Sequence, residues 1–180
     1  LATTLLESNA STSTLFDELL PVLKEKNDLS SIHKVLVHLK DLPEQWLADL
    51  LNFALEQIKN YSELNSQSKL AELLDTLLSI SYCDAILLNH IRRKLTSNST
   101  IKLLHHLHQL SKEVQWADNE KNNTKPNMHQ IIDWISLILD AHHNELLIMG
   151  EDAEFQQLLG NLDNLISRNV STFTEYYIRA

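Results

Sequence analysis

The stretch MHQIIDWISLILDAHHNELLIM, residues 128–149, decides the fold of this chain. It is apolar on nearly every side of a helix, and its one continuous polar stripe is Asp133, Ser136, Asp140 and His143. A helix of this kind must be covered on most sides, because apolar surface in contact with water is unfavourable. The sequence therefore predicts a long central helix with other helices packed around it.

Composition predicts that the elements around this helix are also helices. Leucine supplies about a fifth of the 180 residues, whereas the chain has only two Gly and three Pro. A β-rich fold needs many Gly-dependent turns, which this chain can hardly make. We therefore expect an all-α fold: a single domain over residues 1–180, built as an irregular, α-solenoid-like stack of antiparallel helical hairpins. No repeat of fixed period is apparent.

Local signals suggest where several helices begin and end. Pro21 interrupts the first apolar stripe and predicts a kink or a restart there. Asp28 or Ser30 is expected to cap the second helix. Asp41 is expected to cap the third helix, with Pro43 in its first turn.

Three further expectations concern the organisation of the chain. Ser81 and Asp84 mark the start of a helix whose apolar stripe is expected to include Ile86. The polar stretch 118–127 predicts a mobile loop. The chain begins at Leu1 rather than at Met, so we expect it to be a fragment of a longer protein.

Charge and hydropathy disfavour two classes of partner. The net charge of −9 argues against direct RNA contact, which usually needs a basic face. Arg92 and Arg93, followed by Lys94, form the only compact basic group; they are candidate partner-binding residues within what is otherwise a solvated helix face. The most apolar run, Ile131–Leu139, is too short to cross a bilayer, which needs about 20 apolar residues.

The sequence contains little evidence for a catalytic or metal-binding site. His105 and His108 are spaced to share a metal ion, with Asp140 as a further ligand if their helices face each other. No H-E-x-x-H or C-x-x-C motif supports such a site, so we predict no metal, no cofactor and no enzymatic activity. Cys83, the lone cysteine, is expected to be a small core or helix-boundary residue.

Three aromatic residues are candidate partner contacts. Trp116 follows the sixth apolar stripe, and Tyr176 and Tyr177 lie near the C-terminus. Each has two interpretations: an interface anchor, or packing against neighbouring helices.

Residues 131–170, IIDWISLILDAHHNELLIMGEDAEFQQLLGNLDNLISRNV, resemble the C-terminal helical region of the nucleolar protein 11 family. The resemblance is carried by Trp134, the aliphatic run after it, Leu139 to His142, and the apolar patch ending in Met149. Residues 73–95, LLDTLLSISYCDAILLNHIRRKL, are compatible with the same region.

This resemblance implies a setting for the chain. The parent protein would carry an N-terminal β-propeller and belong to the UtpA subcomplex of the small-subunit processome, in the nucleolus of the nucleus. The domain would then be a protein–protein interaction scaffold that binds other UtpA-type subunits during ribosomal RNA transcription and processing. Alternatives are a helical-repeat adaptor of another large assembly, such as a vesicle coat, and a histidine-metal hydrolase.

Overall fold

The computed structural model describes residues 12–38, 42–58, 69–114, 125–148 and 153–178, and all regular structure in these ranges is helical. This confirms the predicted all-α class. The helices are α2 (Thr12–Glu25), α3 (Leu29–His38), α4 (Glu44–Gln57), α5 (Lys69–Ser79), α6 (Asp84–Lys94), α7 (Ser97–Glu113), α8 (Met128–Ile148) and α9 (Ala153–Ile178).

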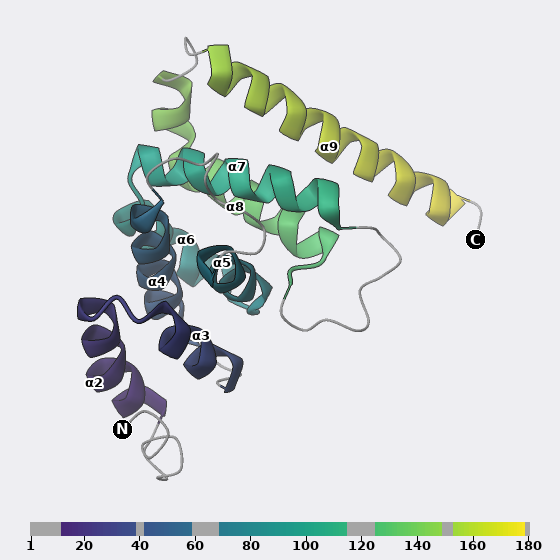
Figure 1. The fold of residues 1–180 in the computed structure, drawn as a ribbon. Coiled ribbons are helices and arrows are strands. Elements are labelled where there is room, and N and C mark those ends of the chain that lie inside the picture. Colours follow the sequence, from purple (N-terminus) through teal and green to yellow (C-terminus); the bar gives the residue numbers. More distant parts are fainter. Residues whose placement is uncertain (1–11, 39–41, 59–68, 115–124, 149–152, 179–180) are drawn as a thin grey trace.

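The helices follow one another along the molecule in chain order (Figure 1). α2 and α3 lie at the N-terminal end, α4 to α6 in the middle, α7 and α8 beyond them, and α9 along the outer side of α7. Neighbours in the chain pack together in the pairs α2–α3, α4–α5 and α7–α8. Helices two apart also pack, in the pairs α3–α5, α4–α6, α6–α8 and α7–α9. The stack is therefore irregular, and its solenoid-like character stays a prediction.

α8 is the central helix that the sequence predicts. It contacts α5, α6 and α7, and Ile131, Trp134 and Ile138 on it are fully buried. The predicted polar stripe is exposed at all four positions: Asp133, Ser136, Asp140 and His143. The sequence predicts one uninterrupted helix here, and this is wrong at His142. Its backbone angles are non-helical (φ −117°, ψ 19°), and the helix bends at this residue.

The start of α3 follows a turn that the sequence partly anticipates. Asn27 has a positive φ of 51°, and the amides of Asn27 and Asp28 donate to the carbonyls of Lys24 and Leu23. This is a Schellman motif that closes α2. The carboxylate of Asp28 then accepts from the amide of Ser31, so Asp28 is the cap of α3.

Two other expectations about helix ends are wrong. α2 continues through Pro21 instead of restarting, because buried leucines on both sides of the exposed proline hold the helix together. Pro43, not Asp41, is the N-cap of α4, and its carbonyl accepts from the amides of Trp46 and Leu47. Asp41 itself lies outside the described residues.

α6 begins at Asp84, one of the two residues predicted to mark its start, but its cap differs from the expectation. Its N-cap is Cys83 rather than Ser81, and the backbone amide of Cys83 donates to the carboxylate of Glu44. Cys83 is therefore a boundary residue and is exposed, not in the core. Ile86 is 49% exposed, so it does not belong to the buried stripe.

Candidate partner-binding surface

The C-terminal ends of two helices are closed by side chains from other helices. The Lys102 ammonium, on α7, donates to the carbonyls of Leu55 (3.3 Å) and Ile58 (2.6 Å) at the end of α4. On α8, the Gln130 amide donates to the Ser79 carbonyl at 2.9 Å, at the end of α5. The last carbonyls of a helix have no partner within the helix, and glycine-based caps are scarce in this chain. These contacts therefore fix the helices relative to one another.

Side chains from other helices also contact α8 on both sides of its bend. Arg92, on α6, donates from Nε to the carbonyl of Ala141 (3.1 Å) and from Nη2 to that of Asp140 (3.3 Å). On the far side of the bend, the Glu145 carboxylate accepts from Ser97 and from Nδ1 of His142. These hydrogen bonds lower the pKa of Glu145.

A buried polar pair joins α5 to α7. Nε2 of His106 lies 2.9 Å from the carboxylate of Asp75, and both side chains are 6% exposed. Lys125 approaches the same carboxylate at 3.8 Å from the surface. Buried charges of this kind need partners, because removal from water is costly. The pair therefore fixes the relative position of α5 and α7.

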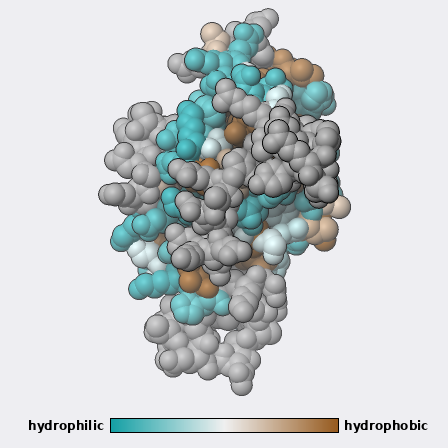
Figure 2. All heavy atoms as spheres, turned by 90° about the vertical axis from the view of Figure 1, so that its right-hand side faces the viewer, coloured by the Kyte–Doolittle hydropathy of each residue, from teal (hydrophilic) through white to brown (hydrophobic). Residues whose placement is uncertain are grey.

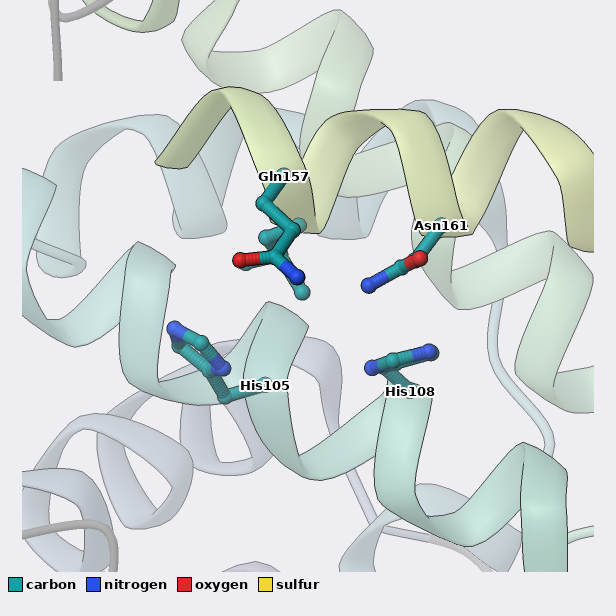
Figure 3. A pocket seen from close by; sticks show the side chains of 5 residues that line it. His105, His108, Gln157 and Asn161 are labelled. Carbon is teal, nitrogen blue, oxygen red and sulfur yellow. The ribbon is translucent and has the colours of Figure 1, made fainter. Parts of the chain in front are cut away.

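A pocket of about 370 Å³ lies between α7 and α9 (Figure 3). His105 and His108 face Gln157 and Asn161 across it, and Leu158 also lines it. Burial lowers the pKa of His108, with smaller contributions from Lys112 and His105, and therefore favours the neutral ring. The side chains that line the pocket include two imidazoles and two amides, which can donate and accept hydrogen bonds.

The structure gives no support to the metal hypothesis in the residues it describes. There, no three His, Cys, Asp or Glu side chains are placed to hold a metal ion together. The two pocket histidines face amides on α9, while Asp140 lies on the exposed side of α8. The spacing of His105 and His108 indicates the histidine pair, but no local signal indicates the amides opposite it, because the packing of α7 against α9 is a tertiary contact.

The predicted partner-binding residues lie at separate places. Arg93 is exposed on the last turn of α6. Arg92 forms a hydrogen bond within the domain, to the carbonyl of Ala141 on α8. Tyr176 and Tyr177 are on the last turns of α9, but their side chains, like the whole of Trp116 and residues 118–124 of the predicted loop, lie outside the described residues.

Apolar side chains also reach the surface. Those that are large and exposed in the described residues are Val22, Val37, Ile86, Leu147 and Ile148. Figure 2 shows one face, on which hydrophobic residues emerge in small separate patches among hydrophilic ones. Leu147 and Ile148 are the most exposed, at 65% and 82%, and both follow the bend in α8.

Within the described ranges, no helix combines the length and the apolar character that a membrane crossing requires. Fold and surface together define an all-α domain of packed helices. The chain belongs to the nucleolar protein 11 C-terminal domain family, whose pattern matches residues 1–177. This confirms the resemblance detected in the sequence, and the nucleolar character of the family confirms the predicted location in the nucleolus.

The chain matches only a small part of the length of one curated relative. Nucleolar protein 11 of Gallus gallus is 29% identical to it over 111 residues, or 58% of this chain. The matched part is 14% of the length of that relative.

Proposed function

We propose that this domain is a protein–protein interaction scaffold in a ribosome-biogenesis complex, and that its partners are other protein subunits of UtpA type. Membership of the nucleolar protein 11 C-terminal domain family carries this proposal, since it supports a role in ribosome biogenesis. The same membership counts against the alternative of a vesicle-coat adaptor.

The rigidity of the helical framework supports a scaffold role. Lys102 ties α4 to α7, and Gln130 ties α5 to α8. A surface that is ordered before binding loses less conformational entropy when a partner docks. These contacts therefore suit a domain that presents a fixed surface to other proteins.

The end of α9 is the part of the domain that we assign to partner binding. In Figure 3, Gln157 lies opposite His105 and Asn161 opposite His108. Glu113, the last residue of α7, is five residues after His108. If the two helices keep the same register, the residue of α9 opposite Glu113 is Ile166, five residues after Asn161. From there, residues 167–178 continue for roughly 18 Å at the rise of an α-helix. Figure 1 shows α9 reaching beyond the end of α7.

The sequence of this projecting part fits an interface. Val170, Phe173 and Tyr176 follow one another at intervals of three residues, and Tyr177 is four residues after Phe173; these spacings are typical of one side of a helix. Aromatic residues are enriched at the centres of protein interfaces. The net charge of −9 over the whole chain favours a protein partner over RNA.

The test is to capture partners from nuclear extract with the tagged 180-residue chain. The Tyr176→Ala/Tyr177→Ala double variant should recover at least tenfold less of the processome subunits, since interface aromatics commonly contribute about 2 kcal/mol or more. The control is Val37→Ala, an exposed apolar substitution on α3. Equal recovery by the double variant and the wild type would refute the assignment to α9.

A further inference from the structure

The bend in α8 has no cause within its own sequence. Neither Pro nor Gly occurs in Met128–Ile148, although sharp bends in helices usually arise at these residues. Another recognised cause is a side chain that inserts into the backbone hydrogen-bond ladder. In a straight helix, the carbonyls of Asp140 and Ala141 would accept from the amides four residues further on.

Arg92 provides such an insertion. Its guanidinium, reaching from α6, donates to both of these carbonyls. Arginine suits the role because its rigid fork carries several donors and stays charged. The contact also accounts for a basic residue that sequence analysis had considered for partner binding.

A second contact fixes the segment after the bend. Ser97, the first residue of α7, donates to Glu145 at 3.0 Å, and His142 lies 3.1 Å from the same carboxylate oxygen. His142 is 2% exposed, and its Nε2 has no hydrogen-bond partner. Because an unpaired buried polar atom is unfavourable, the surrounding contacts must maintain this arrangement.

We propose that Arg92 and Glu145 form a latch that holds α8 bent and sets the direction of its last turns, residues 143–148. These turns rise away from α7 in Figure 1 and lead toward α9. The bend also places Leu147 and Ile148 in solvent. Arg92 is therefore a positioning residue, and α6 determines where the C-terminal part of the domain begins.

Spin-label distances measure this directly in the 180-residue chain. Cys83, exposed and the only cysteine, is one label site, and Leu147→Cys provides the second. Arg92→Ala should shift or broaden the distance distribution of this pair. A pair from Cys83 to Gln109→Cys, on α7, should keep its distribution, because it does not cross the bend.

Three further variants make the outcome decisive. Arg93→Ala removes a neighbouring exposed charge and should change neither distance. Glu145→Ala should disturb the pair that crosses the bend, as Arg92→Ala does. If Arg92→Ala fails to fold, Arg92→Lys provides the test, since one ammonium cannot reproduce the fork. An unchanged distance across the bend in folded Arg92 and Glu145 variants would overturn the latch.

Discussion

The indole N–H of Trp134 donates a hydrogen bond to the carbonyl oxygen of Leu78 at 3.0 Å. Trp134 is fully buried on the central helix, and Leu78 lies in the last turn of α5. The tryptophan therefore fills the core and closes the end of another helix. The same ring lies 4.6 Å from the ring of Tyr82, which precedes α6.

Trp134→Phe tests the hydrogen bond from Trp134 to the carbonyl of Leu78. Phenylalanine keeps an aromatic ring but leaves the Leu78 carbonyl without its donor, so the free energy of unfolding should fall by about 1–3 kcal/mol. Urea denaturation measures the change. Val37→Ala, at an exposed site on α3, should stay within about 0.5 kcal/mol of the wild type. A Trp134→Phe variant as stable as this control would contradict the account.

Lys102→Met isolates the contact between α7 and α4. Methionine keeps much of the aliphatic length but cannot donate to the carbonyls of Leu55 and Ile58. We expect a loss of about 1–3 kcal/mol in thermal or urea unfolding. Lys112→Met is the matched control, because this lysine is exposed on the same helix. Equal effects at the two positions would show that the α4 contact adds no stability.

His106→Leu should be among the most damaging single substitutions. It removes the histidine partner of the buried Asp75 carboxylate, and breaking such a pair typically costs about 3–5 kcal/mol. The double variant Asp75→Asn/His106→Leu should recover part of this loss, since no buried charge is then left. A double variant less stable than His106→Leu would argue against the unpaired charge as the cause.

The sequence predicted the helices better than their ends. Stripes such as Leu73, Leu74, Leu77 and Leu78 are buried because apolar spacing directly reports the covered face of a helix. The caps were harder to predict, since the lysine that closes α4 is more than forty residues away along the chain. The bend at His142 depends on an equally distant arginine and leaves no local signal.

The candidate site was predictable only in part, for the same reason. To predict that His105 and Gln157 line one pocket, one must know which helix covers α7. To predict the role of Arg92, one must likewise know how α6 packs against α8. The family assignment, by contrast, was accessible from the residues around Trp134.

Asp49 should make the domain more sensitive to acid. Burial raises the pKa of its carboxyl, but hydrogen bonds from Lys24 and Lys94 outweigh burial and lower the pKa below its ordinary value. The stabilisation is therefore present above the unfolded-state pKa and is lost as the pH falls through the folded-state pKa. Between about pH 5 and pH 2, wild type should lose more stability than Asp49→Asn. Parallel pH curves from urea titrations would contradict this origin.

Gly160→Ala should stabilise α9. Gly160 lies inside this helix, and a Cβ there would meet no atom within 4 Å. Alanine lowers the entropy of the unfolded chain and favours the helix, so we expect a gain of about 0.5–1 kcal/mol in unfolding free energy. A decrease measured by thermal unfolding would indicate a contact at this position.

The most direct measurement for the central claim is quantitative purification of the full-length protein from nuclear extract, with and without residues 1–180. The proposed scaffold role predicts that deletion of the domain removes processome subunits from the purified complex. The isolated domain should recover the same subunits. Retention of all of them after deletion, or recovery of membrane-traffic proteins by the domain without processome subunits, would contradict the proposed function.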